Sequence, residues 1–175
     1  MSTGEKIPLA RARRIADRAA AALAPAAAEV HVAGSVRRER PFVGDVELVV
    51  VPRMIPDGLF GDERPDLDSI RAVALLWGKI VRSGDRLISV DAGEVKVELY
   101  LCHPPAQLGS ILAIRTGPAE FGALAMQRLA RRGYRHRDGH VVDGAGQIVP
   151  TPTEEEFFRL AGLPCLPPVA RSAVA

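Results

Sequence analysis

Two motifs in the first third of the chain contain the residue types best suited to chemistry. A Gly34-Ser35 pair is followed by two arginines, and Asp45-Val46-Glu47 comes shortly afterwards in an apolar run. Because successive side chains of a strand point to opposite faces, Asp45 and Glu47 share one face. Neighbouring carboxylates repel each other unless a cation holds them, and the N–H groups of a tight turn beside arginines suit a phosphate chain. The pattern predicts a metal-dependent enzyme that acts on a nucleoside triphosphate.

A third carboxylate strengthens this prediction. Residues 95–101 alternate as a strand does and place Glu98 between apolar neighbours. Asp45, Glu47 and Glu98 on adjacent strands suit two Mg²⁺ ions, which prefer oxygen ligands and clamp an in-line displacement at phosphorus. Taken singly, each acid is more simply a solvent-facing strand residue. The three together with the Gly-Ser motif favour a site in which they are both the catalytic residues and the metal ligands.

The order of these motifs resembles the nucleotidyltransferase superfamily and, in detail, the family X DNA polymerases, the group of DNA polymerase beta. The segment 34–38 resembles that family's GSxRR, and 44–47 resembles its GDxD. Thr116-Gly117 resembles the TG that joins palm to thumb, and residues 155–172 resemble the closing segment. The resemblance covers residues 7–172, nearly the whole chain.

This resemblance implies an α+β fold, with a nucleotidyltransferase palm (a mixed sheet with flanking helices) in residues 1–107 and a small α/β thumb lobe in residues 108–175. It implies nucleotidyl transfer from a nucleoside triphosphate to a 3′-hydroxyl, in a minimal gap-filling, repair-type DNA polymerase. The expected partners are nucleoside triphosphates and a DNA primer/template or gapped DNA, and a monomer is expected. The implied nucleotide-binding residues are Gly34, Ser35, Arg38, Gly44, Ile114, Arg115 and Gly117.

The chain departs from the family's pattern at several of these positions. Glu47 and Glu98 stand where the family has Asp, and each is longer by one methylene, about 1.5 Å. We therefore expect Mn²⁺, with its looser geometry, to support more activity than Mg²⁺. Ile114-Arg115 replaces the aromatic pair that crowds the sugar, so weak discrimination between rNTPs and dNTPs is expected. A gapless count places Gly122 and Met126 where family members contact the nucleotide and the template, which predicts low fidelity.

Two alternatives to a DNA polymerase remain open from the sequence. One is a nucleotidyltransferase of the same fold that modifies another acceptor, such as RNA, a protein or a small molecule. The other is a nucleotide- or DNA-binding module whose metal site is weakened by its two glutamates. The thumb-like second lobe favours a DNA polymerase over the first alternative, and the retention of all three carboxylates disfavours the second.

Charge, hydropathy and cysteine content limit the kinds of partner and compartment that the sequence favours. The net charge is only +2, so any grip on nucleic acid is expected to be weak and sensitive to salt. No apolar run is long enough to cross a membrane, and the two cysteines have no metal-ligand spacing, which predicts reduced thiols in a cytoplasmic protein. An arginine cluster could follow a phosphate backbone, although a solvated helix face is the better explanation of such a cluster taken by itself. Its proposed nucleic-acid-binding members are Arg128, Arg131, Arg132 and Arg135, with Arg137 next to them.

Periodicity and turn residues predict the elements that position these groups. Helices are expected at residues 8–23, 67–81, 108–114, 119–132 and 153–160, the last opened by a capping box at Thr153. Strands are expected at residues 29–33, 45–51, 86–90 and 94–101, with short strands at 134–136 and 140–142. Residues 52–65 are rich in proline, glycine and acids, which predicts a loop.

Overall fold

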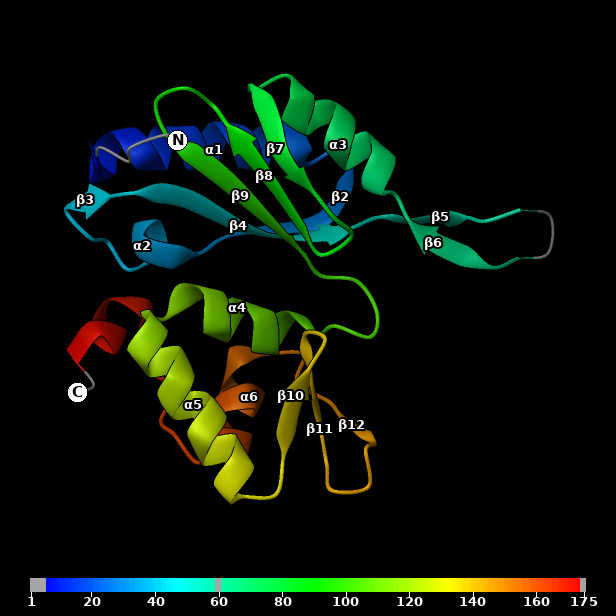
Figure 1. Ribbon diagram of the computed structural model, residues 1–175, viewed down its shortest axis with the longest axis vertical. Coiled ribbons are helices and arrows are strands. Elements are labelled where there is room, and N and C mark those ends of the chain that lie inside the picture. The colour runs from blue at the N-terminus through cyan, green and yellow to red at the C-terminus, as the bar shows by residue number, and fades with distance from the viewer. Residues whose placement is uncertain (1–5, 59–60, 174–175) are drawn as a thin grey trace.

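A mixed five-stranded sheet forms the centre of the first part of the chain (Figure 1). The computed structural model describes residues 6–58 and 61–173. The central pair, β4 and β9, is parallel, and the other neighbours are antiparallel. In spatial order the strands are β2 (Ala27–Val32), β4 (Asp45–Pro52), β9 (Lys96–Leu101), β8 (Leu87–Asp91) and β7 (Lys79–Ser83). The mixed sheet expected from the sequence is therefore confirmed.

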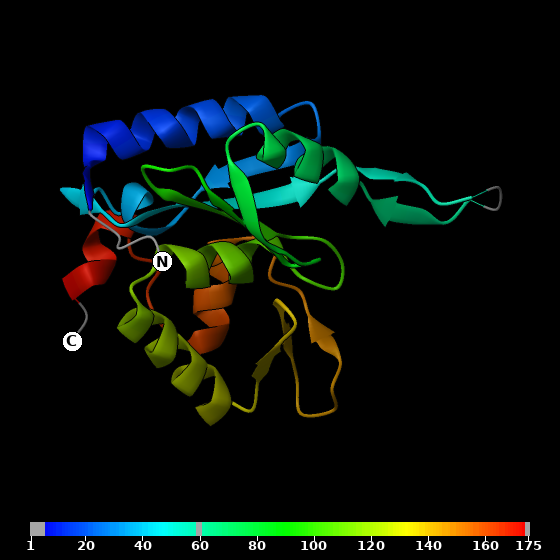
Figure 2. The ribbon, with the colours of Figure 1, turned by 45° about the horizontal axis from the view of Figure 1, so that its top comes forward.

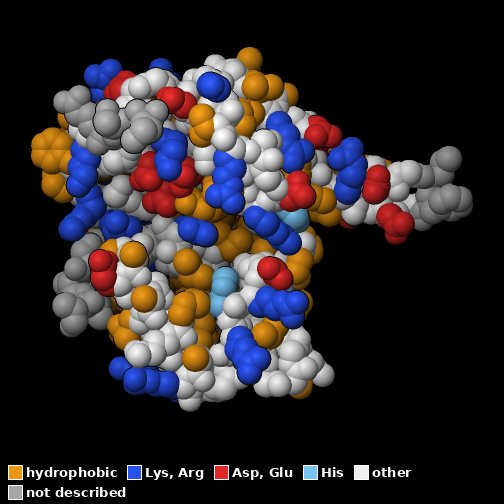
Figure 3. Space-filling view, viewed as in Figure 1, with side chains coloured by type: hydrophobic (Ala, Val, Ile, Leu, Met, Phe, Trp, Pro, Cys, Tyr) orange, Lys and Arg blue, Asp and Glu red, His pale blue; other side chains and the backbone are white. Residues whose placement is uncertain are grey.

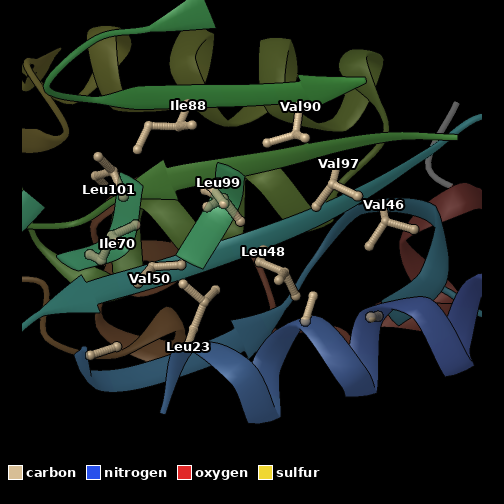
Figure 4. Packing of buried hydrophobic residues seen from close by; sticks show 14 of the residues in the cluster. Leu23, Val46, Leu48, Val50, Ile70, Ile88, Val90, Val97, Leu99 and Leu101 are labelled. Carbon is tan, nitrogen blue, oxygen red and sulfur yellow. The ribbon is translucent and has the colours of Figure 1, made fainter. Parts of the chain in front are cut away.

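One face of this sheet is apolar and is covered by α1 (Leu9–Leu23) and α3 (Leu67–Leu75), as Figure 2 shows. Alanines at the helical spacing of α1 let that helix lie close to the sheet, and Leu23 packs at its end. Figure 4 shows the packing of the strand residues that this face contributes. Those residues alternate along their strands and are buried: Val46, Leu48, Val50, Ile88, Val90, Val97, Leu99 and Leu101. The regular alternation explains why these strands are predictable from the sequence.

The opposite face of the sheet contacts a second group of elements through α4 (Leu108–Thr116). This helix is buried on both sides, because the sheet lies above it and α5 (Ala119–Arg131) and α6 (Glu154–Ala161) lie below. A side chain at Gly109 would overlap the backbone of Thr153, so glycine permits this close approach. A three-stranded antiparallel sheet completes the group: β10 (Arg135–Arg137), β11 (His140–Val142) and β12 (Ile148–Val149).

Chain segments at the ends of elements also follow local rules. Thr153 forms the expected capping box with Glu156 at the start of α6, and Gly162 ends that helix in the left-handed conformation. A short 3₁₀ helix, η1 (Pro168–Ala173), follows. No helix in residues 6–58 and 61–173 is long and apolar enough to cross a membrane.

Several predictions of element boundaries are wrong. The predicted loop at 52–65 contains a projecting antiparallel hairpin of β5 (Met54–Pro56) and β6 (Glu63–Pro65). The helix predicted at 67–81 ends at Leu75, and its last predicted turn belongs to β7. The predicted Gly-Ser turn is a short helix, α2 (Gly34–Arg37). A two-residue pair of β1 (Ile7–Pro8) and β3 (Phe42–Val43), absent from the prediction, precedes α1 and β4.

Candidate active site

The three predicted carboxylates lie on one face of the sheet. In the parallel pairing of β4 with β9, Glu47 lies directly beside Glu98, and Asp45 lies beside Lys96. Directly paired strand residues point to the same side, so all four side chains face the second group of elements rather than α1. Figure 3 shows acidic side chains gathered on the upper lobe near the hollow between the lobes, with Lys and Arg around them.

The α2 segment approaches Glu47 closely because of Gly34. This residue has a φ of +59°, and a Cβ there would overlap the Glu47 carboxylate. A hydrogen bond from the Ala33 amide to the Glu47 carbonyl, 2.9 Å long, fixes the same approach through the backbone. Ser35 follows as a half-buried residue of α2, whereas Gly44 is exposed just before β4. Gly34 therefore has two reasons to be glycine, its backbone conformation and the neighbouring carboxylate.

The environment of Asp45 and Glu47 favours their uncharged forms. Burial, followed by the charges of Asp45 and Glu98, raises the pKa of Glu47 to about 7. Burial and the Glu98 charge also raise the pKa of Asp45. Arg38 and Arg115 oppose the shift at Glu47 but do not cancel it. The pair is therefore short of positive charge, which is the condition in which a divalent cation stabilises neighbouring carboxylates.

Glu98 is in a different state, because neighbouring donors engage both of its oxygens. The Lys96 ammonium lies 2.6 Å from Oε1, and the Tyr100 hydroxyl donates to Oε2 at 2.6 Å. Burial by itself would raise the pKa of Glu98, but the hydrogen bonds from Lys96 and Tyr100 outweigh it and hold that pKa below its ordinary value. This face of the sheet thus has a pair of repelling acids, Asp45 and Glu47, next to a third acid whose two oxygens both accept hydrogen bonds.

These side chains fit divalent metal ions by donor type. Oxygen ligands from two or three carboxylates, with substrate phosphates and water, are what Mg²⁺ uses in sites of this kind. Within residues 6–58 and 61–173, however, no three His, Cys, Asp or Glu side chains are gathered as a closed ligand set. Glu98 is bonded to Lys96 and Tyr100 instead, so metal binding through all three acids requires Lys96 to give up Oε1.

A pocket of about 450 Å³ opens between the sheet and the helices of the second group. Arg38 and Glu47 line its sheet side, and Ile114, Arg115 and Gly117 line it from α4 and the residue after it. The structure therefore brings five predicted site residues together around one space, although they come from two distant parts of the chain. The wall formed by α5 and its start is small or apolar, with Pro118, Ala119, Gly122, Ala123 and Met126.

Arg38 is held at the C-terminal end of α4, and not all of its N–H donors are used. It donates a hydrogen bond to the carbonyl of Thr116, and burial lowers the pKa of its guanidinium, which nevertheless stays charged. Its Nε is buried and has no hydrogen-bond partner among the residues that the structure describes. An unpaired buried donor is costly, and an anion in the adjoining pocket is the kind of ligand that would satisfy it.

The neighbouring arginine belongs to a separate ion cluster, which we call the Glu154 cluster: Arg37, Glu154, Arg171 and the hydroxyl of Thr116. Arg37 donates to both carboxylate oxygens of Glu154, at 2.9 and 2.7 Å, and to Thr116 at 2.6 Å. Arg171, which is almost completely buried, donates to Glu154 at 2.7 Å. The cluster ties α2 to α4, α6 and η1, so it fixes the two groups of elements against each other.

Comparison with known proteins finds similarity to DNA polymerases. DNA polymerase lambda of Rattus norvegicus is 29% identical over 163 residues, a match that covers 79% of this chain and 28% of the polymerase. A crystal structure of Leishmania infantum polymerase beta, a ternary P/T complex, matches with a TM-score of 0.71 and 16% identity. That match covers 95% of this chain and 77% of the other. This chain is similar in sequence to one family X DNA polymerase and in fold to another.

The family X resemblance expected from the motifs is thereby confirmed, and so is the α+β fold. No protein-family model matches the chain. The chain spans little more than a quarter of the length of the polymerase lambda that it matches.

The arginines predicted to contact nucleic acid are all exposed. Arg128 and Arg131 are in the last turn of α5, Arg132 follows it, and Arg135 begins β10. Figure 3 shows Lys and Arg side chains at the lower end of the second lobe and along its strands. Their exposure suits both a phosphate-binding surface and an ordinary solvated surface.

Sequence reasoning missed Tyr100 at this site and Glu154 in the neighbouring ion cluster. The Tyr100 hydroxyl donates a hydrogen bond to Glu98, and the Arg115 guanidinium lies over the Tyr100 ring, 4.0 Å from its centre. The alternation of Lys96, Glu98 and Tyr100 along one strand was the available signal for its position. Glu154 was assigned only to the helix cap, and nothing local in the sequence indicates its distant partners Arg37 and Arg171.

Proposed function

We propose that this protein transfers a nucleotidyl group from a nucleoside triphosphate to a 3′-hydroxyl, as a minimal gap-filling DNA polymerase. In this proposal residues 1–107 act as the palm and residues 108–175 as the thumb. One observation carries it: the interlobe pocket places a carboxylate of the acidic face, Glu47, opposite Arg38 and the 114–117 segment. Such a pocket supplies an anion-binding side and a metal-binding side to the same ligand.

In the proposed complex, Asp45 and Glu47 hold the ion that accompanies the nucleotide, and Asp45, Glu47 and Glu98 hold the second ion. Bound Mg²⁺ would stabilise the charge that develops on the phosphoryl oxygens and lower the pKa of the attacking hydroxyl. Mn²⁺ is expected to support more activity than Mg²⁺, because Glu47 and Glu98 are longer than aspartate.

Phosphate binding is assigned to the α2 region. Ser35 and Arg38 hold the β- and γ-phosphates, with Gly34 and the Gly44 backbone close to them. The unpaired Nε of Arg38 supports this role, since a phosphate oxygen would complete its hydrogen bonding. Gly117 and Ile114 border the nucleotide on the α4 side, together with Arg115.

We expect low fidelity because of the residues that form the opposite wall of the pocket. Gly122 and Met126 offer no side-chain hydrogen-bond donor to a base edge, and Ile114-Arg115 lacks the aromatic bulk that crowds a ribose 2′-hydroxyl. Weak choice between rNTPs and dNTPs, and tolerance of mispairs, are therefore expected. The thumb arginines Arg128, Arg131, Arg132 and Arg135 would contact DNA phosphates without regard to sequence.

The acceptor is the least constrained part of the proposal. The absence of donors on the α5 wall also favours a second candidate, a nucleotidyltransferase that modifies RNA, a protein or a small molecule without a template.

A monomer in the cytoplasm stays a prediction from the sequence. Cys102 and Cys165 are both free thiols, the former buried and the latter exposed.

Extension of a labelled primer tests the proposal directly. Reactions with gapped, templated and single-stranded DNA, each with dNTPs or rNTPs, separate polymerase from template-independent transferase activity. We expect template-dependent addition on short gaps, with rNTPs accepted and with some mispaired products. Addition that occurs only without a template, or no addition to any DNA substrate, would favour the second candidate. Strictly complementary dNTP addition would contradict the expected low fidelity.

A further inference from the structure

Glu98 poses a problem of orientation that an aspartate would not. Its side chain has one more rotatable bond, so fixing its carboxylate toward a metal costs additional conformational entropy. A hydrogen bond from a rigid neighbour removes that freedom before the metal arrives. Metal-binding carboxylates are commonly held in this way by partners that do not themselves touch the ion.

The two oxygens of Glu98 have partners of different mobility. Oε1 is bonded to Lys96, a flexible ammonium whose side chain is 44% exposed, and accepts a longer hydrogen bond of 3.5 Å from the buried Ser89 hydroxyl. Oε2 is bonded to the hydroxyl of Tyr100, a residue that is only 9% exposed. The Lys96 ammonium can move away from Oε1 and be replaced there by a metal ion, whereas the Tyr100 hydroxyl stays bonded to Oε2.

Tyr100 itself is fixed from several sides. It packs in a buried cluster with Val49 and Leu112, which joins the sheet to α4. On another side, the Arg115 guanidinium lies over its ring, with Cζ 4.0 Å from the ring centre. Such stacking is favourable for a planar cation. Arg115 also lines the interlobe pocket, so the contacts run from that pocket through Arg115 and Tyr100 to Glu98.

We propose that Tyr100 is a positioning residue that holds Glu98 through Oε2, so that Oε1 is presented to the second metal ion when Lys96 gives way. Tyr100 thereby compensates for glutamate at a position where the family has aspartate. This inference rests on the proposed function, because it assumes that Glu98 is a metal ligand. Arg115 supports the ring and is the link to the nucleotide side.

Binding of Mn²⁺ in the presence of a non-hydrolysable nucleoside triphosphate provides a measurement independent of catalysis. Electron paramagnetic resonance titration counts the bound ions and gives the affinity of each. Tyr100→Phe removes only the hydroxyl, and we expect it to weaken the second ion by about 10–100-fold. The affinity of the first ion should stay unchanged. Tyr134→Phe, at the other tyrosine of the chain, is the matched control and should bind both ions as the wild type does.

A double-mutant cycle with Glu98→Asp separates positioning from general structural damage. Aspartate at 98 is shorter by about 1.5 Å and cannot reach the hydroxyl, so Tyr100→Phe should then change second-ion affinity by less than about threefold. A full 10–100-fold loss in the Glu98→Asp background would show that Tyr100 acts on the structure in general, and the inference would fall.

The wild type separates failure of this inference from failure of the proposed function. If the wild type binds no second ion, Glu98 is not a metal ligand, and the proposed metal site fails together with the role of Tyr100. If the wild type binds two ions and Tyr100→Phe binds them equally well, the metal site stands and the role of Tyr100 is refuted. Thermal unfolding of each variant confirms that the folded protein is being compared.

Discussion

Buried carboxylates occupy two regions of this molecule, and the cations around them differ. Glu154 is surrounded by Arg37 and Arg171, whose hydrogen bonds outweigh burial and hold its pKa below the ordinary value. Asp45 and Glu47 have two acidic neighbours in each other and Glu98, and their pKa values are raised, first by burial. Glu154, which is neutralised by two arginines of the chain, stabilises the fold. Asp45 and Glu47 have too little positive charge around them, and are therefore suited to binding a metal cation.

The largest contrast should appear in catalysis. Asp45→Asn removes the carboxylate proposed to contact both ions, and metal charge stabilisation is worth several kcal/mol, so the transfer rate should fall by at least about 1000-fold. Single-turnover primer extension measures this rate, with circular dichroism as the check on folding. Wild-type activity in Asp45→Asn would remove the site assignment.

Stability should depend on the carboxylate of the Glu154 cluster and not on that of Glu47. Glu154→Gln leaves the buried Arg171 and the partly buried Arg37 without their carboxylate, which should lower the free energy of unfolding by about 3–5 kcal/mol. Glu47→Gln is the matched substitution in the other region. Because the charged form of Glu47 is disfavoured there, this variant should keep or gain stability in metal-free buffer. Urea denaturation measures both, and equal losses would erase the distinction between the regions.

The Glu154 cluster also predicts an acid limit to stability. A carboxyl whose pKa is lowered in the folded protein stabilises it fully above the value of 4.5 expected for an unperturbed glutamate. This contribution is lost as the pH falls through the lower, folded pKa. Urea denaturation from about pH 6 to about pH 3 should therefore show a steeper loss in the wild type than in Glu154→Gln. Parallel curves for the two proteins would show that Glu154 is not held in its charged form.

The smallest predicted effect concerns the exposed arginines of the second lobe. If Arg128, Arg131, Arg132 and Arg135 contact phosphates, replacing any one with alanine should reduce the slope of log affinity against log salt by about 1. Arg14→Ala, on the exposed side of α1, is the control and should leave the slope unchanged. Fluorescence anisotropy with labelled DNA over a salt series gives these slopes. An unchanged slope in all four variants would identify the cluster as a solvated surface.

The sequence predicts the acid-bearing region better than its surroundings, for physical reasons. Asp45, Glu47 and Glu98 alternate with buried apolar residues on long central strands, so their shared face follows from strand periodicity alone. The 52–65 hairpin was missed because its two strands have only three residues each and include prolines. Helix α3 was predicted too long because Ile80 fits helical spacing, although it lies in the edge strand β7.

Contacts between distant segments account for the rest. Arg37 meets Glu154 across 117 positions of the chain, and no local pattern indicates that pairing. The Tyr100–Glu98 bond is local and follows from strand parity, but recognising its importance requires knowing that Arg115 and the α4 cluster fix the ring. The division into a palm of residues 1–107 and a thumb of residues 108–175 stays a prediction.

The central claim is that the Asp45–Glu47 pair lacks a cation that a metal-bound nucleotide supplies. Thermal unfolding of the wild type, with Mg²⁺ and a non-hydrolysable nucleoside triphosphate added separately and together, tests it most directly. Ligands that bind only the folded state raise its unfolding temperature. We predict a clear rise with both ligands together in the wild type and none in Asp45→Asn/Glu47→Gln. An equal rise in that double variant, or no rise in the wild type, would contradict the account.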